Sequence, residues 1–162
     1  MTNQKLKREI ELAFKDILVA IPENTRLIIN AKKEQILDIL NFLKEKGYDH
    51  LALISCVDWL EEKEFELVYV LTPYPEKGHI ILKTRISREN AQFKTVIPIF
   101  KNAEPYEREL HELFGINFAG HPRLTPLFLE REYKIPPFRK DFDTRKYVEE
   151  VFGPIPAVEE IE

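Results

Sequence analysis

The sequence predicts an α+β protein: a two-layer domain with a mainly antiparallel β-sheet covered by helices, followed by an extended, proline-rich C-terminal segment. Three observations lead to this prediction. Segments with helical periodicity alternate with short β-branched segments. The longest strand-like segments follow one another through short turns, as in an antiparallel meander. Beyond residue 121 proline becomes frequent and helical periodicity is lost.

The first part of the chain predicts two helices separated by one short strand. Residues 5–20 place apolar side chains on one helical stripe, and Pro22 is expected to end this helix. The β-branched segment 25–30 predicts a strand. Residues 33–46 again have helical spacing, and Gly47 is expected to cap that helix.

Three strands and one more helix follow. Residues 50–60 and 64–74 predict a hairpin, and residues 79–87 continue the meander. Each strand needs a covering helix to bury its apolar face, so the order β-α-β-β-β-α indicates two layers. Residues 103–114 predict the last clear helix, which Gly115 ends. On its exposed side we expect ion pairs between Glu104 and Arg108 and between Arg108 and Glu112.

Composition bounds the possible functions. A chain of 162 residues is long enough for one domain, and a net charge of -4 without a long basic run argues against a general nucleic-acid binder. No segment approaches the roughly 20 apolar residues of a membrane span. The N-terminus mixes charged and apolar residues, unlike a secretory signal, so we expect a cytoplasmic protein. The abundance of Lys, Glu and Ile hints at a thermophilic source.

The segment ERELHELFGINFAGHP, residues 107–122, raises the possibility of a zinc hydrolase. In the HExxH motif two histidines one helical turn apart bind one metal ion. Here His111 and Glu112 match, but Gly115 stands where the second histidine is required, and His121 has no partner to complete a ligand set. A stand-alone metal hydrolase using His111, Glu112 and His121 is therefore a disfavoured alternative.

Other residues offer little chemistry. Cys56 is the only cysteine, which excludes an internal disulfide, and it lies in an apolar strand where a buried, inert thiol is expected. Asp58 follows it without an evident basic partner. The five glycines are too scattered for a phosphate-binding loop. We therefore expect no catalytic residue, metal site or cofactor on this chain.

We divide the chain into an α+β domain, residues 1–115, and an extended C-terminal segment, residues 116–162, that docks on partner subunits. The segment holds six of the eleven prolines together with many large apolar side chains. Proline denies these side chains a regular core element, so they must cover their own domain or a partner. We favour a partner for much of the segment.

Two charged runs, residues 107–109 and 139–141, are flanked by aromatic residues and prolines. Each can be a solvated surface run or an interface anchor. Arg139 carries a planar guanidinium suited to a carboxylate across an interface. The residues alone do not decide between these two interpretations.

The segment 107–122, followed by PPFRKDF at 136–142, closely resembles the signature of the 30 kDa subunit family of respiratory complex I (NADH:quinone oxidoreductase, NuoC type). The family includes the corresponding subunits of membrane-bound, energy-converting [NiFe] hydrogenases. The resemblance covers roughly residues 25–145, and two long elements in the right order make it specific. One departure is that Arg123-Leu124-Thr125-Pro126 replaces an acidic-Leu-Arg-Arg run, which favours the hydrogenase- or ferredoxin-linked branch.

The resemblance implies a non-catalytic structural subunit of the peripheral arm of an ion-translocating oxidoreductase complex on the cytoplasmic side of the membrane. It would clamp the hydrogenase-like large subunit and lie beside Fe–S subunits, which carry the clusters. A soluble assembly adaptor is a further alternative. The resemblance and the charged runs together give these expected partner-interface residues: Glu107, Arg108, Glu109, Phe114, Phe118, His121, Pro137, Arg139, Lys140, Asp141 and Phe142.

Overall fold

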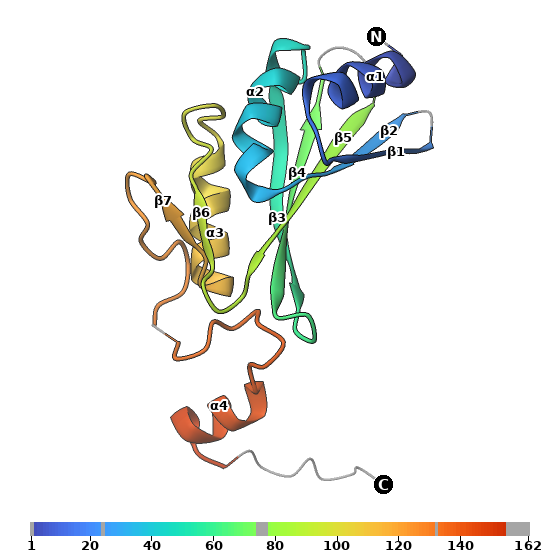
Figure 1. The fold of residues 1–162 in the computed structure, drawn as a ribbon. Coiled ribbons are helices and arrows are strands. Elements are labelled where there is room, and N and C mark those ends of the chain that lie inside the picture. Colours follow the sequence, from blue (N-terminus) through green and yellow to red (C-terminus); the bar gives the residue numbers. More distant parts are fainter. Residues whose placement is uncertain (1, 24, 74–77, 132, 155–162) are drawn as a thin grey trace, which may run out of the picture.

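A five-stranded sheet forms the centre of the molecule in a computed structural model of the chain, with the strand order β1-β2-β5-β4-β3 (Figure 1). The structure describes residues 2–23, 25–73, 78–131 and 133–154. The sheet strands are β1 (Leu18–Glu23), β2 (Arg26–Asn30), β3 (His50–Trp59), β4 (Glu64–Thr72) and β5 (His79–Ser87). The last residue of the expected strand 64–74 and residues 155–162 of the expected C-terminal segment lie outside the described residues.

The sheet is mixed but mainly antiparallel, which confirms the predicted α+β class. β3, β4 and β5 form the expected antiparallel meander, and β1 is antiparallel to β2. Of the described strands in this sheet, only β2 and β5 form a parallel pair. The parallel pair arises because α2 (Ile36–Glu45), β3 and β4 intervene between these two strands in the chain.

Helices cover one face of the sheet and the core lies between the two layers (Figure 1). Alternate residues of the strands face this core: Phe65, Leu67, Tyr69 and Leu71 of β4 are all fully buried. α1 (Asn3–Ala13) contributes Leu6 and Ile10, and α2 contributes Ile36, Ile39, Leu40 and Leu43. Among the described residues, no helix lies over the opposite face of the sheet.

The expected first helix, 5–20, is wrong in its second half. α1 ends at Ala13, and Asp16 adopts a left-handed backbone with φ of 56° that reverses the chain. The following residues, with Val19 and Ile21, form β1 instead. Pro22 therefore lies inside a strand and does not end a helix, which is possible because β1 is an edge strand and needs no second hydrogen-bonded neighbour.

The C-terminus of α2 is as expected. Gly47 has a φ of 93°, and its N–H donates to Lys44 O while the Tyr48 N–H donates to Leu43 O, both at 3.0 Å. These two bonds form a Schellman motif, which satisfies carbonyls that the helix leaves unpaired.

Several elements were not predicted. β6 (Gln92–Lys94) precedes α3 (Ala103–Phe114) in the chain and β7 (Asn117–Ala119) follows it. These two strands pair in parallel and form a second, small sheet. α4 (Thr144–Phe152) lies in the C-terminal segment, beyond the domain in Figure 1, and Asp143 caps it by accepting from the Lys146 N–H at 3.0 Å. Among the described residues, no helix is long and apolar enough to cross a membrane.

Candidate subunit-docking site

Glu107 at the start of the signature is buried and organises the entry to α3. Its carboxylate accepts hydrogen bonds from Thr95 Oγ1 at 2.6 Å and from the Val96 N–H at 2.7 Å. Burial raises the pKa of Glu107 to about 7, against the opposing effect of these two hydrogen bonds. The side chain thus fixes the connection from β6 to α3 from inside the domain.

Arg108 and Glu112 on α3 hold the C-terminal segment. Arg108 donates from Nε to Thr125 O at 3.0 Å and from Nη2 to Pro126 O at 2.7 Å. The Glu112 carboxylate accepts from the backbone N–H groups of residues 127–129, with the shortest bond at 2.6 Å. The expected ion pairs along the helix are therefore replaced by bonds to the chain that returns over it.

The two histidines of the signature bond to backbone carbonyls. His121 Nδ1 accepts from the Arg123 N–H at 3.1 Å, so Nε2 carries the proton that it shares with Glu104 O at 3.2 Å. His111 Nδ1 lies 2.9 Å from Ile116 O and donates to it. Within the part of the chain that the structure describes, no three His, Cys, Asp or Glu side chains gather as a metal site would require.

Asp58 receives the basic partner that its sequence neighbourhood lacks. Arg88 donates to it from Nε at 2.9 Å and from Nη2 at 3.3 Å, and the Lys140 N–H donates to Asp58 Oδ2 at 2.8 Å. Arg88 also forms an ion pair with Asp141. The hydrogen bond from Arg88 is the main cause that lowers the pKa of Asp141. The RKDF element is thereby tied to the ends of β3 and β5.

Arg139 passes beneath the C-terminus of α3. Its Nε donates to Phe114 O at 2.7 Å, and its guanidinium lies 5.2 Å from the centre of the Phe65 ring. Gly115 has a φ of 74°, and a Cβ there would lie 2.9 Å from Arg139 Nη2 and 3.0 Å from Pro136 Cγ. Gly115 thus ends the helix as predicted and also makes room for the returning segment.

The C-terminal segment leaves large apolar side chains exposed. None of the α4 residues is buried. Tyr133, Phe142 and Tyr147 contact one another as a small aromatic cluster. The exposed apolar side chains on this segment are Leu127, Phe128, Ile135, Phe138, Val151 and Phe152. We define these six side chains as the apolar tail surface.

The expected interface residues fall into two groups. Phe114, Phe118 and Glu107 are buried in the domain itself. The others lie on α3 or the returning segment with partly or largely exposed side chains: Arg108, Glu109, His121, Pro137, Arg139, Lys140, Asp141 and Phe142. Sequence reasoning missed the roles of Asp58, Arg88 and Glu112 because their partners lie 82, 53 and 15 to 17 residues away.

Cys56 is buried in the core, as its apolar surroundings in the sequence predict. Burial raises the pKa of Cys56 to about 12, so its thiol stays protonated.

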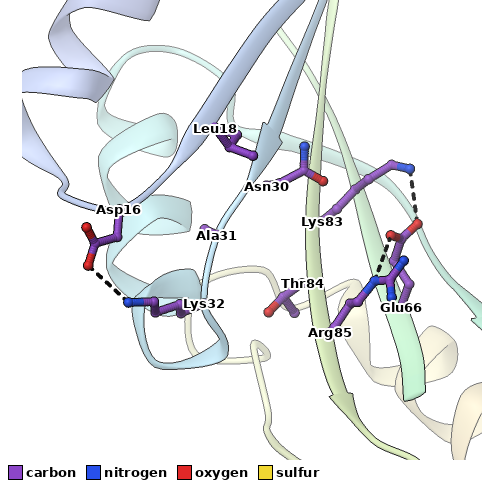
Figure 2. A pocket seen from close by; sticks show the side chains of 9 residues that line it. All are labelled: Asp16, Leu18, Asn30, Ala31, Lys32, Glu66, Lys83, Thr84 and Arg85. Carbon is purple, nitrogen blue, oxygen red and sulfur yellow. Dashed lines mark hydrogen bonds and ion pairs between the residues drawn. The ribbon is translucent and has the colours of Figure 1, made fainter. Parts of the chain in front are cut away.

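Figure 2 shows a pocket of about 330 Å³ beside the end of β2. Lys83 and Arg85 both pair with Glu66 there, and Lys32 pairs with Asp16. Every charged residue that lines this pocket is already paired.

The fold and the site define a class of protein: an α+β domain that uses charged side chains to hold its own C-terminal segment, while the apolar face of that segment stays exposed. The sequence matches the family described as "Respiratory-chain NADH dehydrogenase, 30 Kd subunit" over residues 29–148, and the chain belongs to this family. The predicted resemblance is confirmed.

Two relatives show the range of the family. The chain is 35% identical over 113 residues to the C subunit of the F(420)H(2) dehydrogenase of Methanosarcina mazei, covering 68% of this chain and 72% of that protein. It is 32% identical over 128 residues to the C/D subunit of the NADH-quinone oxidoreductase of Yersinia pestis. That match covers 73% of this chain but only 21% of the longer protein.

Two solved structures share the fold. A chain of the membrane-bound sulfane sulfur reductase, an archaeal respiratory membrane complex, aligns with a TM-score of 0.88 and 29% identity over 98% of this chain and 96% of that one. The trypsin-resistant fragment (1-134) of Nqo5 aligns with a TM-score of 0.64 and 27% identity over 74% and 99%. The homologues are thus subunits of complex I-like and archaeal respiratory membrane complexes.

Proposed function

We propose that this chain is a non-catalytic structural subunit of the peripheral arm of a membrane-bound, ion-translocating oxidoreductase complex, on the cytoplasmic side. Its C-terminal segment clamps the hydrogenase-like large subunit and the neighbouring Fe–S subunits. The observation that carries this proposal is the apolar tail surface, part of which is displayed on residues 125–141, a stretch that side chains of the domain bind at both ends. The family membership supports the type of complex.

The apolar tail surface favours contact with another protein. Phe128, Phe138 and Phe152 are 57, 60 and 70% exposed. Complete burial of such a side chain stabilises an interface by roughly 1.5–3 kcal/mol. Apolar side chains that follow one another along one exposed segment are typical of an interaction surface.

The hydrogen bonds behind the segment prepare it for docking. Glu112 and Arg108 fix residues 125–129, while Asp58 and Arg139 fix residues 136–141. A segment whose backbone is already ordered loses less conformational entropy when it binds. The family signature residues, including the buried Glu107 and Phe118, thus support the proposed interface indirectly, by holding the structure beneath the exposed segment.

We assign electron transfer to the neighbouring subunits and no resident cofactor to this chain. His111 and His121 use ring nitrogens to bond to carbonyls, which supports a structural role over the hydrolase alternative. The replacement of the basic run after Pro122 favours the hydrogenase- or ferredoxin-linked branch. The alignment over 98% of the chain with a chain of an archaeal respiratory membrane complex supports the role as a subunit of such a complex.

The test compares charge substitutions on and off the apolar tail surface. Phe128→Glu and Phe152→Glu, each in the tagged full chain, should reduce co-purification of partner subunits by at least about tenfold, because a charge would be buried in the interface. Leu12→Glu is the matched control, since Leu12 is 87% exposed on α1, away from the segment. Undiminished co-purification of both tail variants would contradict the proposal.

A further inference from the structure

β3 is an edge strand whose middle, residues 53–57, lacks the usual protection of an edge. Leu51–Val57 contains no charged residue and no proline, and among the described strands β3 pairs only with β4 (Figure 1). Natural proteins normally protect an exposed edge with charges, proline or a bulge. The opposite edge, β1, has such protection in Pro22 and in a register shift between Ala20 and Glu23. β3 also has a register shift, between Leu51 and Leu53, but this shift lies at the end of the strand that α3 contacts.

The register shows which backbone groups of β3 face outward. The Lys83 carbonyl accepts from the residue that follows β2, so the Lys83 backbone faces β2. Its partner Val68 on β4 therefore faces β3, where it pairs with Ser55. Because backbone groups alternate along a strand, the N–H and C=O groups of Ile54 and Cys56 point away from the sheet.

Both ends of this edge are occupied, and its middle is not. Asn102 Nδ2 donates to Leu51 O and Tyr106 Oη donates to Ala52 O, both at 2.8 Å. At the other end, the Asp58 side chain binds the returning segment. Among the described residues, none outside β4 is hydrogen-bonded to the backbone of residues 53–57.

Apart from Ser55, the side chains beside the free edge are apolar on both faces. Leu53 and Val57 are 39 and 37% exposed on the helix-free face. Ile54 and Cys56 lie on the core face and are buried. A strand added here would thus find an apolar neighbour at most positions of the ladder.

We propose that residues 53–57 of β3 accept a short, extended and uncharged segment of another subunit, which becomes the sixth strand of the sheet. Outward N–H and C=O groups at two-residue spacing are matched by an extended backbone. The bound ends of the edge limit the added strand to about five residues. The site is distinct from the apolar tail surface, and only the origin of the strand rests on the proposed function.

The first test places a charge beside the edge. Ser55→Lys puts an exposed lysine next to the outward groups while the Ser55 backbone keeps its bonds to β4. Ala20→Lys is the matched control, exposed on the opposite edge strand. In the tagged full chain, we expect Ser55→Lys to lower the recovery of at least one partner about tenfold and Ala20→Lys to leave it unchanged. Equal recovery with both variants overturns the strand proposal but leaves the proposed function intact.

The second test measures amide exchange at Ile54 and Cys56. In the isolated full chain these amides should exchange much faster than that of Ser55, and in the purified complex they should be protected. Slow exchange in the isolated chain would overturn the proposal because the edge would not be free. A dimer of the isolated chain that Ser55→Lys dissociates would also overturn it, by assigning the edge to a second copy. A wild-type chain that captures no partner overturns both proposals.

Discussion

Arg88 binds Asp58 through two parallel hydrogen bonds, Nε–Oδ1 at 2.9 Å and Nη2–Oδ2 at 3.3 Å. The Asp58 side chain is only 2% exposed and that of Arg88 13%. The same carboxylate accepts from the Lys140 N–H, and the same guanidinium pairs with Asp141. One buried ion pair thus joins the sheet to the C-terminal segment.

Asp58→Asn should destabilise the domain. The substitution leaves the Arg88 charge with Asp141 alone, and removal of one partner from a buried pair typically costs about 3–5 kcal/mol. We expect the free energy of unfolding in urea to fall by about 3 kcal/mol. Asp16→Asn is the control: its pair with Lys32 is largely exposed, so a loss below about 1 kcal/mol is expected. Equal losses of unfolding free energy in the two variants would show that the Asp58–Arg88 pair contributes no more to stability than an exposed ion pair.

Gly115→Ala should be more harmful than Gly47→Ala. Both glycines have positive φ, but a Cβ at Gly47 meets nothing within 4 Å, while one at Gly115 meets Arg139 and Pro136. Gly47→Ala should cost about 1 kcal/mol of unfolding free energy through backbone strain alone. Gly115→Ala should cost about 1–3 kcal/mol more because of crowding. Equal losses in thermal or urea unfolding would mean that the returning segment does not press on Gly115.

Glu107 should make stability fall as the pH rises towards 8. Its pKa is about 7 in the folded protein, above the ordinary value of 4.5. The folded state therefore binds a proton more tightly than the unfolded state, and this stabilisation is present below pH 4.5 and lost as pH passes 7. The shift corresponds to about 3 kcal/mol.

The measurement is urea unfolding between about pH 5 and pH 8 for wild type and Glu107→Gln. The amide can still accept from the Val96 N–H, so the variant should fold. We expect a declining stability curve for the wild type and a flatter one for the variant. A wild-type curve parallel to that of Glu107→Gln would show that Glu107 is ionised throughout.

Arg139→Lys should loosen the returning segment without unfolding the domain. A lysine lacks the planar guanidinium that donates to Phe114 O and stacks on Phe65. The Phe138 amide, which donates to Leu113 O at 3.0 Å, should then exchange about tenfold faster. Arg145→Lys is the control because its pair with Glu149 is on the surface of α4. Unchanged exchange at Phe138 would show that other contacts hold the segment.

The sequence predicted elements whose signals are local. The meander β3-β4-β5 followed from alternating apolar residues, and Gly47 and Gly115 marked helix ends by their own conformational freedom. The error at residues 14–23 has a local cause too. Ile17 continues the helical stripe of Leu6, Ile10 and Phe14, so the periodicity does not show that the helix ends at Ala13 and that Leu18–Glu23 form a strand.

The site was predictable only in outline. The charged signature stood out, but a charged residue on a helix is ordinarily solvated, and nothing local distinguishes Glu107, which is buried, from its exposed neighbours. Arg88 and Asp58 are 30 residues apart and meet because β4 pairs with both β3 and β5 and so brings the ends of these two strands together. Long-range contacts of this kind depend on topology, which sequence periodicity does not specify.

We propose above all that this chain is a structural subunit of a larger respiratory complex. The most direct test is affinity purification of the tagged chain from gently solubilised membranes of its native host, with mass spectrometry and metal analysis. We expect stoichiometric recovery of a hydrogenase-like large subunit, Fe–S subunits and antiporter-like membrane proteins, with the iron assigned to the neighbours. A chain recovered alone, soluble and carrying its own bound metal would contradict this claim.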